Sequence, residues 1–295
     1  MKPHLLKINL NSEHSFNVRH DKVPHFYNKW HYHPEVELVY IIKGSGQQFI
    51  GDNIHVFKPG DMLLIGANLP HLWRSDEKFL KKKSGIEVEA IVIHFKPDCF
   101  GKNFFQLPEN KLLAKLLNRA QQAIRIKRQT QQAVAVLMEE LLHAANTERI
   151  ILLLRILRLI AESKQVKPVC TKDLLIHYKP EETERINDIY QYILNNYSKN
   201  ISLNEIARIA YLSPHSFCRY FKSRTNKTFS RFLIEVRIGK ACKMLAETSK
   251  SISDICYECG FQNFTNFNRH FKNIVKNTPR AHRKYYHEIK KTLIE

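Results

Sequence analysis

Four side chains near the start of the chain have types and a spacing suited to metal coordination. His31 and His33 are followed by Glu37, and His71 comes later, after a Pro-Gly-Asp turn sequence. In a strand, His31, His33 and Glu37 point to one face, because side chains alternate with a period of two. Three imidazoles and a carboxylate suit a divalent transition metal. The same four residues could instead line a small-molecule pocket, which is our preferred interpretation, or serve a purely structural role.

A second pattern is a repeated hexapeptide. Residues 217–222 and 267–272 both have the sequence Phe-x-Arg-aromatic-Phe-Lys, and they lie fifty positions apart. A repeat of this length that occurs twice is too short for a solenoid and indicates one duplicated helical unit. On a helix, the phenylalanines four positions apart share one face, and the arginine and lysine lie on the other. Arginine pairs with guanine through two hydrogen bonds, so the repeat predicts DNA contacts.

The predicted DNA contacts divide into two kinds. Residues early in each repeated helix should meet base edges, whereas flanking basic residues should meet phosphates, which add affinity without sequence information. The predicted DNA-binding residues are His215, Ser216, Cys218, Arg219, Lys222, Phe264, Thr265, Asn268, Arg269, Lys272, Lys276 and Arg280. Phe264 is also expected to pack inward beside Phe267 and Phe271. A merely solvated basic face would explain one such helix, but it explains two matching copies poorly.

Composition is consistent with a polyanionic partner. The chain has 295 residues and a formal net charge of +19, and its last 113 residues contain 20 Lys and Arg against 9 Asp and Glu. The six cysteines form no disulfide framework, and Cys256-x-x-Cys259 has no second pair to complete a zinc site. No apolar run has the length of a signal peptide core or a membrane span, so we expect a cytoplasmic protein without membrane contact.

The elements that must position these residues differ along the chain. Short β-branched runs separated by turn sequences between residues 35 and 95 predict a small sandwich or barrel. Helical periodicity follows from Pro108 to Ile160. Its last helix is apolar over more than one face, which indicates two packing partners, either within one chain or including a second copy. We expect a homodimer. Residues 164–180 are polar and contain two prolines, as is typical of a linker.

The last hundred residues predict two helix-turn-helix units. Ser202 and Glu205 fit a capping box before a short helix, and Ser213 with Pro214 should begin the next helix. In the second unit we place Ser253 before a short helix over residues 254–259, followed by a turn in which Gly260 takes a positive φ. A long helix over about residues 229–246 should join the units.

These motifs carry two resemblances to known families. Residues from about 185 to 286 resemble the DNA-binding domain of the AraC/XylS family of bacterial transcription regulators. The signature residues are Ile252–Cys256, Gly260-Phe261, residues 267–272 and Thr278-Pro279. Cys256 replaces the usual alanine, His282 the usual tyrosine, and Asn277 the usual glycine, where Asn should adopt a left-handed turn.

The first hundred residues resemble the cupin barrel. The two histidines, Glu37 and Gly44 match its first motif. Its second motif is matched at His71, whereas Gly66 and Asn68 stand at its usual Pro and Gly positions. A cupin domain is also common at the front of AraC/XylS proteins, so the resemblance covers nearly the whole chain.

The resemblance implies a multidomain α+β protein, with an N-terminal cupin-like β-barrel and following helices, then an all-α domain of two helix-turn-helix units. We expect a sensing barrel over 1–105, a helical, dimerising region over 106–163, a linker over 164–182 and a DNA-binding domain over 183–290.

The implied function is a sequence-specific transcription regulator of double-stranded DNA, controlled by a small-molecule effector, with a sugar or sugar acid as the family-level expectation. RNA polymerase would be a partner of an activator. We expect no enzymatic activity and no cofactor. The alternatives are a metal-dependent cupin enzyme with a DNA-binding tail and a nonspecific architectural DNA-binding protein.

Overall fold

The computed structural model describes residues 4–6, 14–76, 79, 87–170 and 180–292. The chain separates into two compact units, residues 2–178 and 179–295, called here the N-terminal and C-terminal domains. The first combines strands and helices, and every regular element of the second within residues 180–292 is a helix, so the predicted α+β class is confirmed. None of the described helices is both long and apolar enough to cross a membrane.

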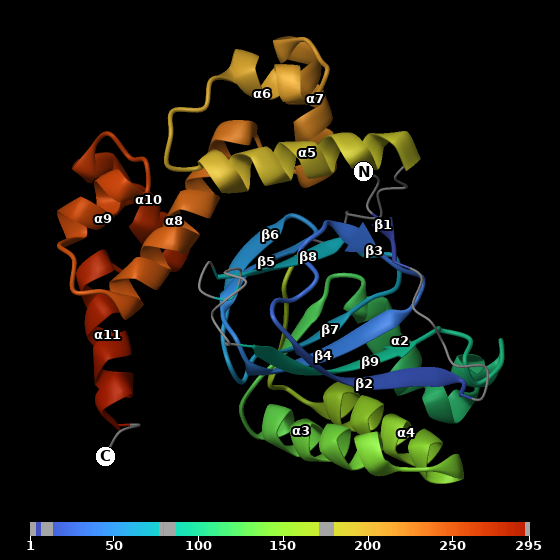
Figure 1. Ribbon diagram of the computed structural model, residues 1–295. Coiled ribbons are helices and arrows are strands. Elements are labelled where there is room, and N and C mark those ends of the chain that lie inside the picture. The colour runs from blue at the N-terminus through green and yellow to red at the C-terminus, as the bar shows by residue number, and fades with distance from the viewer. Residues whose placement is uncertain (1–3, 7–13, 77–78, 80–86, 171–179, 293–295) are drawn as a thin grey trace. The chain divides into compact units, whose positions relative to one another are not determined.

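The strands of the N-terminal domain form two sheets (Figure 1). Their orders are β1-β3-β8-β5-β6 and β11-β10-β7-β4-β9-β2, so the described strands form two hydrogen-bonded sheets, where we expected one barrel. The strands are β1 (His4–Leu5), β2 (Phe16–Val23), β3 (His31–Tyr32), β4 (Val36–Lys43), β5 (Gly46–Ile50), β6 (Asn53–Phe57), β7 (Met62–Ile65), β8 (His71–Ser75), β9 (Val88–Phe95), β10 (Ile124–Ile126) and β11 (Val166–Pro168).

Alternation along the strands creates two apolar cores. On β4, Val39 and Ile41 join a cluster with Trp73 of the other sheet, whereas Leu38 faces the opposite way and joins a cluster with the helices. Helices α3 (Arg128–His143) and α4 (Asn146–Glu162) lie under the six-stranded sheet in Figure 1. The same core includes α2 (Lys111–Ala120), which follows the 3₁₀ turns η1 (Phe104–Gln106) and η2 (Pro108–Asn110). The face of β4 that carries Glu37 is therefore the one between the sheets.

Two strands after β9 extend the six-stranded sheet. β10 pairs with β7, and β11, within the stretch expected to be a linker, pairs with β10. Residues 171–179 lie outside the described residues, and Pro180 begins the next helix.

The C-terminal domain consists of two helical units that share one long helix. Its elements are α5 (Pro180–Asn196), α6 (Leu203–Ile209), α7 (Pro214–Thr225), α8 (Phe229–Glu247), α9 (Ile252–Glu258), α10 (Phe264–Val275) and α11 (Pro279–Thr292). At the start of α8, Phe232 stacks on Tyr190 and meets Phe221 of the first unit. Farther along α8, Ile238 and Leu245 belong to the buried cluster of the second unit.

Local capping confirms the first predicted unit and corrects the second. Ser202 and Glu205 form the predicted capping box. In the second unit, α9 begins at Ile252 and its cap is Ser251, which forms a capping box with Asp254. Our placement of the helix start after Ser253 was wrong. The box requires an acidic side chain three residues after the cap, and the residue three positions after Ser253 is a cysteine.

The left-handed residue at the end of α10 also differs from our expectation. Lys276, not Asn277, has a positive φ of 62°. Asn226, fifty positions earlier, has a φ of 53° and ends α7 in the same way. The duplicated helices thus terminate at equivalent positions, and in the second copy that position holds a lysine.

Candidate DNA-binding surface and buried histidine cluster

Helices α7 and α10 are oriented by their caps and by paired phenylalanines. Ser213 Oγ accepts a hydrogen bond from the Ser216 backbone N–H, and Asn263 Oδ1 accepts one from Asn266. The phenylalanines at positions 217, 221, 267 and 271 are each 0% exposed. Because these anchors occupy one face of each helix, the opposite face is presented to solvent.

The structure places most of the predicted DNA-binding residues on those outward faces. The exposed ones are His215, Cys218, Arg219, Lys222, Thr265, Arg269, Lys272, Lys276 and Arg280, and the half-buried ones are Ser216 and Asn268. The expectation that Phe264 packs inward was wrong, since this side chain is 39% exposed. As the first residue of α10 it stacks on Phe267 at the edge of the core, with ring centroids 6.2 Å apart.

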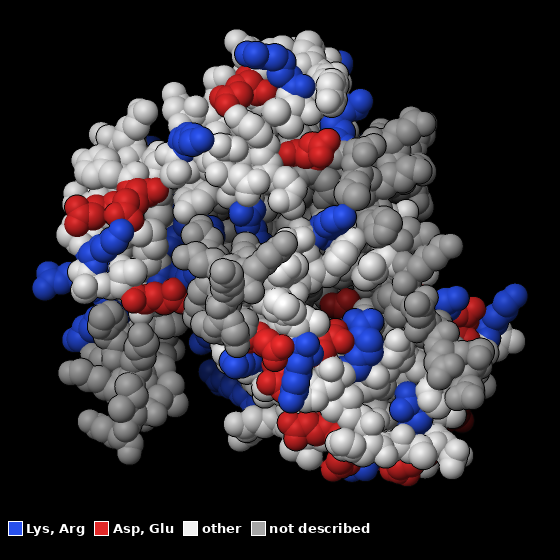
Figure 2. All heavy atoms as spheres, in the orientation of Figure 1, with Lys and Arg blue, Asp and Glu red and all other residues white. Residues whose placement is uncertain are grey.

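One predicted base-contacting side chain is already held in place. Arg269 Nη2 donates a hydrogen bond of 3.1 Å to Asn266 Oδ1 on the same exposed face. Figure 2 shows, for one side of the molecule, that Lys and Arg lie interspersed with Asp and Glu. The candidate surface is defined by the outward faces of α7 and α10, which carry Arg219, Lys222, Arg269 and Lys272.

The second candidate site lies between the sheets of the N-terminal domain. Two cross-strand pairs build it: His31 on β3 is opposite His71 on β8, and Glu37 on β4 is opposite His94 on β9. The structure brings His31, His33, Glu37 and His71 together, with one potential ligand atom from each lying within 4.8 Å of the others. All four are buried, with exposures between 1% and 6%.

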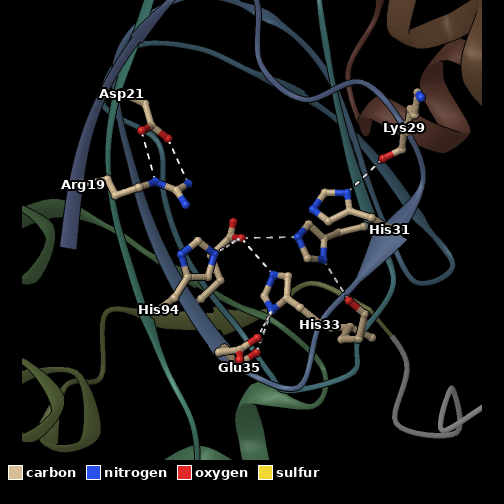
Figure 3. Close-up of polar contacts among 10 residues, drawn as sticks. Arg19, Asp21, Lys29, His31, His33, Glu35 and His94 are labelled. Atoms are coloured by element: carbon tan, nitrogen blue, oxygen red, sulfur yellow. Dashed lines mark hydrogen bonds and ion pairs between the residues drawn. The ribbon is translucent and has the colours of Figure 1, made fainter. Parts of the chain in front are cut away.

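Backbone carbonyls fix the orientation of three imidazoles. The Nδ1 atoms of His31, His33 and His71 lie 2.9, 3.0 and 2.8 Å from the carbonyl oxygens of Lys29, Glu35 and Leu69. A carbonyl only accepts, so each Nδ1 carries the proton and each Nε2 has a free lone pair when the ring is neutral. Figure 3 shows the rings of His33 and His94 in contact with one carboxylate, and the ring of His31 nearby in contact with Lys29.

Three imidazole nitrogens converge on a single carboxylate oxygen. Glu37 Oε2 lies 3.2 Å from His33 Nε2, 3.4 Å from His71 Nε2 and 3.0 Å from His94 Nε2. Burial alone would raise the pKa of Glu37, but His71, His33 and His94 outweigh it and hold that pKa well below its usual value. Burial in turn lowers the pKa of His31 and of His33. The site therefore favours an ionised Glu37 carboxylate and disfavours the charged forms of His31 and His33.

This donor set fits a divalent transition metal. His33 Nδ1 faces the Glu35 carbonyl, so this ring contacts Glu37 Oε2 through Nε2, the atom that would bind a cation. A cation bound by His31, His33, His71 and Glu37 would be held by three imidazole nitrogens and one carboxylate oxygen. Imidazoles whose Nδ1–H groups are held by carbonyls have the supporting hydrogen bonds typical of metal ligands.

His94 is the residue of this cluster that the sequence analysis missed. It is 1% exposed, and its Nε2 is the donor closest to Glu37 Oε2. Strand alternation could have identified it, because residues 88, 90, 92 and 94 share one face and the first three are apolar. A hydrogen bond from His94 would hold the Glu37 carboxylate in position toward the other histidines.

Two family models match the chain, one over each candidate site. A model described as "Helix-turn-helix domain" matches residues 206–285, and one described as "Cupin domain" matches residues 22–79. The first range includes α7 and α10, and the second includes the four potential metal ligands.

Curated relatives resemble the chain over different lengths. The HTH-type transcriptional activator RhaR of Mannheimia succiniciproducens is 23% identical over 260 residues, which is 86% of each chain. The uncharacterized HTH-type transcriptional regulator YdeC of Bacillus subtilis is 29% identical over 103 residues, which is 35% of each chain. A solved AraC-type transcriptional regulator from Chromobacterium violaceum is 26% identical, with a TM-score of 0.35, and covers 37% of this chain and 96% of its own.

Proposed function

This chain belongs to the AraC/XylS family of transcriptional regulators, and we propose that α7 and α10 enter two successive major grooves of its DNA target. The observation that carries the proposal is the duplication of a capped helix whose phenylalanines are buried and whose polar face is exposed. The N-terminal half of such a helix meets base edges in the major groove. Successive grooves on one side of the duplex are about 34 Å apart.

We assign base contacts to outward-facing residues in the first half of each recognition helix, α7 and α10. Arg219 and Arg269 occupy equivalent positions and suit guanine through paired hydrogen bonds. Cys218 and Asn268 also occupy equivalent positions but differ in chemistry, so they would distinguish the two half-sites. Phosphates would be contacted by Lys222, Lys272, Lys276 and Arg280.

We propose that a ligand in the N-terminal domain controls DNA binding. The ligand must bind two arrangements of the protein unequally, because otherwise it shifts no equilibrium. A sugar or sugar acid is the expectation drawn from the family. The enclosed histidine cluster supports a second candidate, a divalent transition-metal ion held by His31, His33, Glu37 and His71. We propose a sensing role and no enzymatic activity for this site.

We also propose that the regulator acts in the cytoplasm as a homodimer that contacts RNA polymerase when it activates. Much of α4 packs within the chain, with Leu153 and Ile156 fully buried. Ile150 and Ile151 on α4 and Val136 on α3 remain exposed and support a second-copy contact. Analytical ultracentrifugation of wild type and Ile151→Asp tests this contact. A dimer that dissociates more readily in the variant is expected, and a monomeric wild type at micromolar concentration contradicts it.

Selection from a pool of random DNA tests the proposed function. The full-length protein should enrich fragments with two dissimilar sequence blocks about one helical turn apart. Loss of information in one block after Arg219→Ala, and in the other after Arg269→Ala, would assign each helix to its half-site. Enrichment of no common sequence would contradict the proposal.

A further inference from the structure

The loop after α5 lies directly against the turn of the second helix-turn-helix unit. Gly260, in that turn, has a φ of +83°, and a Cβ added to it would be 2.6 Å from the Ser198 carbonyl oxygen. Heavy atoms do not approach that closely without bonding, so the two backbones leave no room for a side chain here. The two units of the C-terminal domain therefore meet through backbone as well as through the shared helix α8.

Arg237 of α8 binds both sides of this junction. Its Nε donates to the Tyr197 carbonyl oxygen at 2.7 Å, and its Nη2 donates to the Lys199 carbonyl oxygen at 2.8 Å. These carbonyls come just after the C-terminal end of α5, where a positive charge is favourable. The guanidinium carbon also lies 5.8 Å from the centroid of the Phe261 ring, in the turn of the second unit.

The position of Arg237 on α8 explains why it can reach both units. It directly precedes Ile238, which belongs to the buried cluster of the second unit, and it follows Phe232, which packs in the first unit. Lys240, nearly one turn later, has its ammonium 5.6 Å from the centroid of the Tyr197 ring. The loop after α5 is thus attached to α8 at the point where the two cores meet.

The second unit repeats half of this arrangement. Arg283 of α11 donates from Nη2 to the Lys250 carbonyl oxygen at 2.5 Å. In both units, an arginine from the helix after the recognition helix bonds the loop before the short helix. Arg237 also contacts the Phe261 ring of the second unit. Arg237 therefore joins the two units, whereas the bond from Arg283 to Lys250 lies within the second unit. Arg283 is therefore a matched control that shares the local role.

We propose that Arg237 is a positioning residue that fixes the separation and rotation of α7 relative to α10, and so sets the half-site spacing that the protein accepts. The inference rests on the proposed function, because it concerns how the two recognition helices divide one DNA site. Rigid attachment makes the second helix enter its groove without a further search of orientations. A loosened junction would tolerate more than one spacing.

The test compares a selected DNA site with the same site carrying one inserted base pair between its blocks. One base pair rotates the second block by about a tenth of a turn. For wild type we expect the insertion to raise Kd by about tenfold or more, comparable to a mismatched base pair. The spacing ratio is the Kd for the site with the insertion divided by the Kd for the selected site. For Arg237→Ala we expect this ratio to be at least about threefold lower than for wild type, because the second helix can follow the displaced block.

Three variants separate positioning from folding. Circular dichroism first confirms that each variant is folded. Arg283→Ala, which removes the local contact in the second unit, and Arg231→Ala, an exposed residue earlier on α8, should retain the wild-type ratio. Arg237→Lys keeps the charge but cannot span two carbonyls with one planar fork, so its ratio should fall between those of wild type and Arg237→Ala. If Arg237→Ala does not fold, the ratio measured for Arg237→Lys tests the proposal.

The proposal is overturned if the folded Arg237 variants retain the wild-type ratio, or if Arg283→Ala lowers it equally. A wild-type protein that prefers no sequence over random DNA would instead overturn the proposed function.

Discussion

At the scale of single residues, Lys276 combines an unfavourable backbone conformation with an exposed charge. A lysine with a φ of 62° is strained, whereas asparagine adopts this region more readily and already does so at position 226. We predict that Lys276→Asn raises the free energy of unfolding by about 0.5–1 kcal/mol, measured by urea denaturation. The same variant should bind all DNA sequences more weakly, because a phosphate contact is lost.

Lys272→Asn is the matched control for this prediction. Lys272 is also exposed on α10 but has helical geometry, so its replacement should weaken DNA binding without stabilising the fold. An unchanged unfolding free energy in Lys276→Asn would show that the left-handed lysine is not strained.

The paired arginines should control sequence preference rather than overall affinity. We predict that Arg269→Ala costs about 1–3 kcal/mol on the selected site and relaxes preference at one base pair, because a bidentate guanine contact is lost. Fluorescence anisotropy with single-base variants of the site measures this cost. Lys222→Ala should instead weaken binding to every sequence similarly. The same profile for both variants would contradict the division into base and phosphate contacts.

At the scale of elements, the start of α9 provides a test of local structure. Ser251 accepts from the Asp254 backbone N–H at 3.0 Å, and the Asp254 carboxylate accepts from the Ser251 N–H at 3.2 Å. We predict that Ser251→Ala destabilises the protein by about 1 kcal/mol in urea denaturation. Ser253→Ala, an exposed change inside the helix, should be close to neutral. Equal effects of the two substitutions would contradict this assignment of the cap.

The helical half was predictable because its signals are local. The box at Ser202, the start at Pro214 and the phenylalanine spacing each depend on residues within one or two turns. The cap of α9 was misplaced because two serines two positions apart compete, and only the acid three residues later decides between them. The left-handed Lys276 was missed because lysine carries no turn signal of its own.

The sheet half was less predictable because its contacts are distant in sequence. The expectation that His31, His33 and Glu37 share one face of a single strand was wrong, because His31 lies on β3 and Glu37 on β4, in different sheets, and His33 lies between these strands. The pairing of Glu37 with His94 also depends on strand order, which the sequence pattern does not specify. The strand pairing of residues 166–168 with β10 was missed for the same reason.

At the scale of the whole molecule, the histidine cluster links a ligand to the stability of the fold. A ligand that binds only the folded state raises its stability, by about 2.7 kcal/mol at a concentration of one hundred times Kd. We predict that Zn²⁺, Ni²⁺ or Mn²⁺ raises the Tm of metal-depleted full-length protein, and that His71→Ala abolishes the rise. His143→Ala, an exposed histidine of the same domain, should respond like wild type.

Metal content distinguishes a site from nonspecific stabilisation. Elemental analysis after gel filtration should find about one divalent ion per wild-type chain, as one tetrahedral or octahedral donor set implies, and far less in His71→Ala. A rise in Tm that is equal in wild type and His71→Ala would remove the metal candidate and leave an organic effector.

The central claim is that two recognition helices in one chain give sequence-specific DNA binding, and competition at fixed salt tests it most directly. Labelled selected site is displaced by unlabelled selected site or by random DNA of equal length. We predict a preference of about 10³ or more for the selected site in wild type. The double variant Arg219→Ala/Arg269→Ala should lose most of that preference while it retains its affinity for random DNA. Equal displacement of wild type by both competitors would contradict the claim.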